Sequence, residues 1–211
     1  MKFEELQQLL GDQVVFRTGT LMAGQSSPEH LRRQLTRWVK AGKVLSLRRG
    51  VYVLASPYAK SHPHPFVLAN ALRRASYVSL QSALAWYGCI PEFSPTTTSV
   101  TTERPERLQT PMGRFLFRHL RQDLFREMRR VEVSAGQYAL VATPEKALVD
   151  LLYLTPHSDE EGYLDELRLE SRGILKKDRL LKTAEATESG KVIRAVGRLE
   201  RLFQEEWGEP L

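Results

Sequence analysis

The spacing of apolar residues predicts two short helices at the start of the chain. In residues 2–10 the apolar positions recur at helical spacing, and the predicted buried stripe consists of Phe3, Leu6, Leu9 and Leu10. Gly11 and Asp12 are expected to end this helix. The next segment, residues 14–24 (VVFRTGTLMAG), is predicted to form a second short helix, which Gly19 weakens.

A third helix is predicted over residues 28–41, where the terminal signals are stronger. Ser27 suits the N-cap, Pro28 suits the first helical position, and Gly42 suits the C-terminal stop. At about 100° per residue, one face of this helix carries the apolar residues Leu31, Leu35, Trp38 and Val39. The opposite face carries His30, Arg33, Arg37 and Lys40.

Residues 45–54 (LSLRRGVYVL) predict a β-hairpin with Arg48 and Arg49 at its tip. The local charge is unusual. Lys and Arg outnumber Asp and Glu by six in residues 1–60 and by three in residues 61–155, whereas acids are in excess by three in residues 156–211. The first sixty residues therefore carry an excess equal to the net charge of the whole chain, +6. Such a basic lobe indicates a polyanionic partner, and it favours nucleic acid over a membrane surface.

Three helices followed by a basic-tipped hairpin is the element order of a winged helix-turn-helix, which we assign to residues 1–56. In that fold the third helix enters the major groove, and the hairpin is expected to lie within reach of phosphates or a minor groove. We therefore predict base or phosphate contacts from Ser27, His30, Arg33 and Arg37, and backbone contacts from Lys40, Arg48 and Arg49. An arginine-rich helix face can also be only a solvated surface. The element order, the charge excess and the basic hairpin tip together favour DNA binding.

Residues 57–65 are predicted to be a linker, because prolines interrupt regular structure there. His62 and His64 alternate with these prolines and have no Cys or acidic residue nearby, so no metal site is expected.

Residues 66–211 mix helical and strand-like patterns. Helices are predicted at 65–75, 80–87 and 144–154, and strands at 96–105 and 113–120. Residues 131–142 predict two short strands on either side of Ala135 and Gly136. Ser79 is expected to cap the helix that follows it. Three further helical segments are predicted after residue 156, the last running to Trp207 with Val192, Val196, Leu199 and Phe203 at helical spacing. The predicted fold class is α+β, with a helical C-terminal part.

No catalytic, cofactor or metal site is predicted. Ser82 lacks the Gly-x-Ser-x-Gly setting of a nucleophile, and the chain has no Gly-rich phosphate loop and no Cys/His zinc pattern. Glu145, Lys146 and Asp150 are the best cluster of ionisable residues. We interpret Lys146 and Asp150 as an exposed helical salt bridge, because a nuclease needs several acids around a metal.

Five stretches resemble the AbiEi family of antitoxins from type IV toxin–antitoxin systems, a family linked to phage abortive infection. They are LRRGVYVL (47–54), YVSLQSALAWYG (77–88), TTTSVTTERPERLQTPMGRFLFRHL (96–120), ALVATPEKALVDLLYL (139–154) and YLDELRLE (163–170). Each stretch alone is weak evidence for the family, but their order and spacing together are specific. The resemblance covers nearly the whole chain.

The resemblance implies two functions and no enzyme activity. The N-terminal domain would bind inverted repeats in the promoter of its own operon and repress it, which calls for two copies on the DNA. The region 66–211 would counteract a nucleotidyltransferase-like toxin without forming a stable complex with it. The resemblance assigns no residue to this antitoxin surface.

Two other hypotheses stay open. One is a stand-alone winged-helix transcription factor whose C-terminal region senses a ligand or dimerises. The other is a nucleic-acid-processing enzyme.

No apolar run approaches the roughly 20 residues needed to span a bilayer, the N-terminus has no signal-peptide pattern, and Cys89 is the single cysteine. These features predict a cytoplasmic protein.

Overall fold

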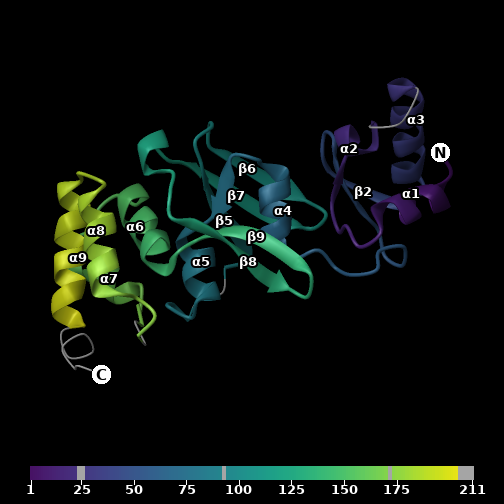
Figure 1. The fold of residues 1–211 in the computed structure, drawn as a ribbon. Helices are drawn as coiled ribbons and strands as arrows, with labels where there is room; N and C mark the ends of the chain where they lie inside the picture. The colour runs from purple at the N-terminus through teal and green to yellow at the C-terminus, as the bar shows by residue number, and fades with distance from the viewer. Residues whose placement is uncertain (23–26, 92–93, 171–172, 204–211) are drawn as a thin grey trace.

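The computed structural model describes residues 1–22, 27–91, 94–170 and 173–203. The molecule is elongated: the first helices lie at one end, a β-sheet lies in the middle, and the last helices lie at the other end (Figure 1). The fold is α+β, as predicted. Among the described residues, no helix is long and apolar enough to cross a membrane.

In the N-terminal unit (residues 1–54), the described residues form three helices and three strands. They are α1 (Phe3–Leu10), β1 (Phe16–Arg17), α2 (Thr18–Met22), α3 (Pro28–Lys40), β2 (Val44–Arg48) and β3 (Val51–Leu54). The strands form an antiparallel sheet in the order β1-β3-β2. The predicted first helix, third helix and hairpin are confirmed.

Two details of this unit differ from the sequence predictions. Leu9 is 58% exposed, because only the strip of α1 that contains Phe3, Leu6 and Leu10 packs against the core of this unit. Within the segment 14–24, Phe16 and Arg17 form a strand, since β3 offers an edge with which they pair. Only Thr18–Met22 of that segment is described as helical, and residues 23 and 24 lie outside the described residues.

The C-terminal unit (residues 65–203) is built on a six-stranded mixed sheet in the order β6-β7-β5-β4-β9-β8. Its strands are β4 (Ser76–Val78), β5 (Thr96–Thr101), β6 (Glu106–Thr110), β7 (Gly113–His119), β8 (Met128–Ser134) and β9 (Gln137–Ala142). Its helices are α4 (Pro65–Leu72), α5 (Leu80–Trp86), the 3₁₀ helix η1 (Gln122–Leu124), α6 (Pro144–Leu154), α7 (Glu161–Glu166), α8 (Lys177–Glu185) and α9 (Gly190–Leu202). The β4–β9 and β5–β7 pairs are parallel, and the other pairs are antiparallel.

The three predicted C-terminal helical segments correspond to α7, α8 and α9. In α9 the predicted apolar residues Val192, Val196 and Leu199 are buried. The predicted continuation of this helix to Trp207 lies outside the described residues from position 204 onward.

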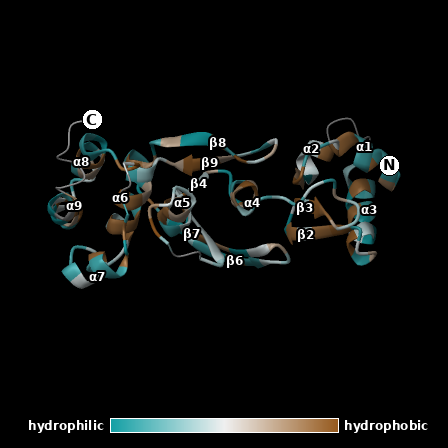
Figure 2. Ribbon diagram, turned by 90° about the horizontal axis from the view of Figure 1, so that it is seen from below, coloured by the Kyte–Doolittle hydropathy of each residue, from teal (hydrophilic) through white to brown (hydrophobic). Residues whose placement is uncertain are grey.

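The hairpin β2–β3 belongs to both hydrophobic cores. Val44 packs with α1 and α3, whereas Leu47, Val51 and Val53 pack with the core of the C-terminal unit. Figure 2 shows these two strands as hydrophobic and lying between α3 and α4. Residues 55–64 contain no helix or strand, as expected of a linker, but the hairpin joins the two units through side-chain packing as well.

His64 ends this linker as the N-cap of α4. Its Nδ1 accepts a hydrogen bond of 3.2 Å from the backbone N–H of Phe66. Burial lowers the pKa of the His64 imidazole below its ordinary value of 6.5. The folded protein therefore favours the neutral ring, in which Nδ1 can accept a hydrogen bond.

We expect His64→Asn to weaken the pH dependence of stability. As the pH falls below about 6.5, the unfolded chain binds a proton at His64 that the folded chain resists, so stability drops until the lowered folded pKa is reached. Asparagine keeps a capping oxygen and does not titrate. Between about pH 7.5 and pH 5.5, the melting temperature of the wild type should therefore fall further than that of His64→Asn. The variant His62→Asn, at an exposed position, should behave like the wild type.

Candidate nucleic-acid interface

Local sequence signals determine where α3 begins and which of its sides is buried. Ser27 is the N-cap, and its hydroxyl accepts a hydrogen bond of 3.4 Å from the backbone N–H of His30. Leu31 and Leu35 are buried. Trp38 is partly buried, and its ring lies 5.5 Å from the ring of Phe3 in α1, in an edge-on arrangement. The predicted apolar face of α3 therefore faces the core of the N-terminal unit.

The opposite side of α3 is exposed and basic. The structure brings five of the predicted DNA-binding residues to this side, and all five are exposed: Ser27, His30, Arg33, Arg37 and Lys40. In Figure 1, α3 lies at the end of the molecule away from the six-stranded sheet. This exposed side of α3, residues 27–40, is called the basic face below.

The side chains of the basic face are weakly held. Arg33 pairs with Glu29 at 3.0 Å, and both side chains are more than 70% exposed. Such a surface pair contributes about 0–1 kcal/mol, so a phosphate can replace the carboxylate at little cost. Within the described residues, no ion pair or hydrogen bond holds the side chain of Arg37 or Lys40. Their charges are therefore available to an external anion.

Two further residues, Arg32 and Thr36, are exposed on the flank of the same helix and were not among the predicted contacts. The Thr36 hydroxyl donates to the carbonyl of Arg32 at 2.9 Å. Both positions follow from the helical wheel, since Arg32 lies about 100° from Arg33 around the helix. A wider arc around the polar side would have included them.

Arg48 has a different position from the one predicted. Its guanidinium donates to the carbonyl of Leu72 at 3.0 Å and pairs with Glu106 at 3.4 Å. Arg17 donates in the same way to the carbonyl of Ala71. These two arginines bind the last carbonyls of α4, where the helix dipole favours positive charge. The hairpin tip therefore contacts the C-terminal unit, and Arg48 would have to break these bonds to reach DNA.

Arg49, the other predicted hairpin contact, is exposed. It follows β2 in the turn that leads to β3, next to Gly50, whose φ of 82° suits a residue without a side chain. Of the two hairpin arginines, only Arg49 projects into solvent.

We expect Arg48→Ala to destabilise the protein by about 1–2 kcal/mol, because it removes a charged hydrogen bond and an ion pair that are partly screened by solvent. Arg49→Ala removes the same charge from an exposed site and should change stability by less than about 0.5 kcal/mol. Urea denaturation of both variants measures the difference. Equal stabilities would show that the contacts of Arg48 with α4 and β6 contribute nothing.

Lys146 and Asp150 form the predicted pair on α6, but the prediction that it is exposed is wrong. The two side chains are 3% and 1% exposed, and the Lys146 ammonium is in direct contact with Asp150 Oδ1. Tyr77 donates to Asp150 Oδ2 at 3.0 Å, and Ser79 donates to the same oxygen at 2.7 Å. Ser79 occupies the N-cap position of α5 as predicted, but its hydroxyl is engaged with Asp150 and does not cap the helix.

Burial dominates the electrostatics of this network. It raises the pKa of the Asp150 carboxyl, an effect opposed by the Lys146 ammonium and by the hydroxyls of Ser79 and Tyr77. Burial and the neighbouring Asp150 carboxylate also raise the pKa of the Tyr77 hydroxyl, which therefore stays protonated and donates. The polar groups of this network satisfy one another's hydrogen bonds inside the core, as expected of an ion pair with a structural role.

Glu145, the third member of the predicted cluster, is also buried. Its carboxylate accepts a hydrogen bond of 3.0 Å from the backbone N–H of Lys176, the N-cap residue of α8. Across the ranges that the structure describes, no three His, Cys, Asp or Glu side chains are grouped as metal ligands.

A second basic surface lies on the C-terminal unit. Arg107, Arg114 and Arg118 of β6 and β7 line a groove of about 620 Å³. Arg118 donates to the carbonyl of Leu154 at 2.6 Å, whereas Arg107 and Arg114 are exposed. These three arginines thus lie on one face of the sheet.

Comparison with known proteins yields similarity to solved structures and no similarity to a known family. No protein-family model matches the chain, and no curated protein matches it. The crystal structure of the protein Rv2827c from Mycobacterium tuberculosis is similar in fold, with a TM-score of 0.50 and 16% sequence identity. The similarity covers 92% of this chain and 76% of that one. At this identity, the likeness concerns the fold alone.

Proposed function

We propose that this protein is a DNA-binding repressor of its own operon, with a winged helix-turn-helix in residues 1–56. The observation that supports this most directly is the basic face of α3, which is exposed at the free end of the molecule with its apolar side buried beneath it. The element order α1-β1-α2-α3-β2-β3 is also that of a winged helix. In this proposal α3 enters the major groove, and Arg33 and Arg37 contact base edges or nearby phosphates.

The hairpin has a smaller part in this proposal than the sequence suggested. Arg48 is held by α4 and β6, so Arg49 is the hairpin residue available for a phosphate. Lys40, in the last turn of α3, is available for a second phosphate. An operator with inverted repeats would bind two copies, with half-sites about 34 Å apart if both lie on one face of the DNA.

The second half of the proposal is an antitoxin function of the AbiEi type, which rests on the sequence resemblance. The C-terminal unit would oppose a nucleotidyltransferase-like toxin without a cofactor and without stable binding. Both activities would take place in the cytoplasm, where the operator DNA is. A stand-alone regulator without a toxin partner is the alternative.

Binding of the purified protein to the DNA upstream of its own gene, compared with scrambled DNA of equal length at two salt concentrations, tests the repressor function. We expect preference for the native sequence and a linear fall of log affinity with log salt concentration. Weak binding that does not depend on the DNA sequence and disappears at the higher salt concentration would contradict the proposal. The basic face would then bind DNA only through non-specific electrostatic attraction.

Co-expression tests the antitoxin function separately. A nucleotidyltransferase-like gene next to this one, expressed alone, should arrest growth, and this chain should restore growth. Rescue should persist with a variant that no longer binds the operator, because toxin opposition is assigned to the C-terminal unit. The stand-alone regulator is favoured if no such gene is adjacent or if growth is not restored.

A further inference from the structure

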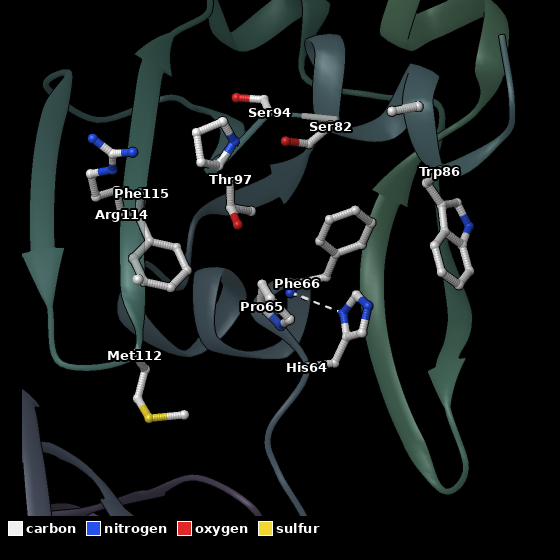
Figure 3. Close-up of a pocket in the computed structure, with 13 residues that line it drawn as sticks. His64, Pro65, Phe66, Ser82, Trp86, Ser94, Thr97, Met112, Arg114 and Phe115 are labelled. Atoms are coloured by element: carbon white, nitrogen blue, oxygen red, sulfur yellow. Dashed lines mark hydrogen bonds between the residues drawn. The ribbon is translucent and has the colours of Figure 1, made fainter. Parts of the chain in front are cut away.

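Strand β7 separates two hollows of the C-terminal unit. On one side of it, Phe66, Trp86 and Phe115 line an aromatic cavity of about 530 Å³. On the other side lies the groove of about 620 Å³ that is described above. Figure 3 shows the Arg114 side chain directed away from the aromatic cavity, toward the side of the groove. The groove is therefore the hollow to which this positive charge belongs.

The strand register brings three arginines together in the groove. Side chains alternate between the two faces of a strand, so Arg114, Leu116 and Arg118 of β7 point to the same face. Arg107 of β6 lies directly opposite Leu116 in the antiparallel pair. It is thus the diagonal neighbour of both β7 arginines, at about 7–8 Å. Arginine side chains are long enough for all three guanidinium groups to reach one ligand above Leu116.

These like charges lack a counter-charge on their own face of the sheet. Among the described residues, none of those that line the groove is acidic. Within the same part of the chain, no ion pair or hydrogen bond holds the side chain of Arg107 or Arg114. Like charges this close repel one another. A bound anion would remove this repulsion, so the groove is suited to an anionic ligand.

Arg118 differs from the other two arginines because it is fixed in place. It is partly buried, and its guanidinium donates to the carbonyl of Leu154, the last residue of α6, at 2.6 Å. A guanidinium has five N–H donors, so this bond leaves donors for a ligand. One oriented arginine beside two exposed ones can bind several phosphate oxygens at once, because each guanidinium binds phosphate through parallel hydrogen bonds.

The rest of the lining suits the uncharged part of a nucleotide. Leu116 is partly exposed between the arginines and offers an apolar surface to a planar ring. Gln81 of α5 and Gln109 of β6 line the same groove, and among the described residues no hydrogen bond holds either carboxamide. A carboxamide presents a donor and an acceptor side by side, which matches the pattern of polar groups along a nucleobase edge.

We propose that this groove binds a nucleotide through its linked phosphate groups. The phosphates would lie among the three arginines, and the base would cover Leu116 within reach of a glutamine carboxamide. Helices α5 and α6 border the groove, and its volume lies within the range of about 300–1,000 Å³ that is typical of small-molecule sites. A mononucleotide therefore fits better than a nucleic-acid strand. The inference does not depend on DNA binding, because no residue of α3 lines the groove.

Calorimetric titration of the full chain with ATP, GTP, CTP and UTP tests the site. We expect at least one of them to give saturable binding at submillimolar concentration. Its monophosphate should bind at least about tenfold more weakly, since the loss of one charged hydrogen bond corresponds to about that factor. Absence of saturable binding of all four at millimolar concentration would overturn the proposal.

Two other probes distinguish a nucleotide from other sources of phosphate. Inorganic triphosphate should bind at least about tenfold more weakly than the best nucleotide, because it has no base to contact Leu116 or the carboxamides. Equal affinity would contradict the assignment of a nucleotide. A short single-stranded oligonucleotide that displaces the nucleotide at lower concentration than any mononucleotide would show that the groove binds a nucleic-acid strand instead.

Three variants locate the binding. Arg107→Gln and Arg114→Gln should each lower the affinity for the nucleotide by at least about tenfold, and both positions are exposed, so folding should be little affected. Arg130→Gln is the matched control. It removes an exposed arginine from β8, at least four strand spacings of about 4.8 Å from β6 and β7, and should leave the affinity unchanged. If all three variants weaken binding equally, the effect is one of net charge, and the groove is not the site.

Discussion

Replacing Asp150 with Asn is expected to destabilise the protein by about 3–5 kcal/mol, the usual cost of breaking a buried ion pair from one side. Asparagine has nearly the same shape and can still accept hydrogen bonds from Tyr77 and Ser79. The loss therefore measures the cost of leaving the Lys146 ammonium buried and without its counter-charge. Urea denaturation followed by circular dichroism measures the change.

The double variant Lys146→Met, Asp150→Asn is the matched control, because it removes the unpaired charge and keeps most of the side-chain volume. It should be more stable than Asp150→Asn alone, as buried pairs replaced by apolar groups often cost little. If Asp150→Asn does not fold and the double variant does, the same conclusion holds. A loss below about 1 kcal/mol in the single variant would contradict a charged pair in the core.

Replacing Arg33 and Arg37 together with Ala is expected to weaken operator binding by about 2–6 kcal/mol, if each arginine makes a base contact worth about 1–3 kcal/mol. Preference for the operator over scrambled DNA should shrink in parallel. If either arginine binds phosphate instead, affinity should fall for every sequence, and the salt slope should decrease by about 0.9 for each phosphate that is no longer neutralised. Titration of operator and scrambled DNA at several salt concentrations distinguishes the two cases.

The control for this experiment is the variant Lys182→Ala, Arg201→Ala. It removes the same charge from exposed positions on α8 and α9, at the opposite end of the molecule from α3 (Figure 1). Binding should be nearly unchanged, because these charges lie beyond the screening length of about 10 Å at 0.1 M salt. If both double variants weaken binding equally, the effect is one of net charge, and α3 is not the recognition helix.

Local sequence signals were sufficient for α3 and for its basic face. Ser27, Pro28 and Gly42 act on the backbone next to them, so the ends of this helix follow from nearest neighbours in the chain. The periodicity of its apolar residues then determined which side is exposed. Periodicity was not sufficient for Leu9, which was predicted to be buried and is exposed, since the width of the buried strip on α1 depends on what packs against it.

The environment of individual charges was decided by the tertiary structure. The spacing of Lys146 and Asp150 predicts that they touch, but their burial depends on Tyr77 and Ser79, which lie more than seventy positions earlier in the chain than Asp150. Arg48 likewise finds its acceptors 24 and 58 positions away, at Leu72 and Glu106. Periodicity describes neighbours along one element and contains no information about which other element covers it.

The sequence by itself therefore determined the α+β class, most of the helices, the hairpin after α3 and the basic side of α3, because these depend on local hydrogen bonding and on the alternation of polar and apolar residues. It did not predict the strands β1, β4 and β6. Only the tertiary structure decided that the hairpin joins the two units, that Lys146 and Asp150 are buried, and that Phe66, Trp86 and Phe115 enclose a cavity. Each of these features brings together residues distant in the chain, and long-range packing is what places them.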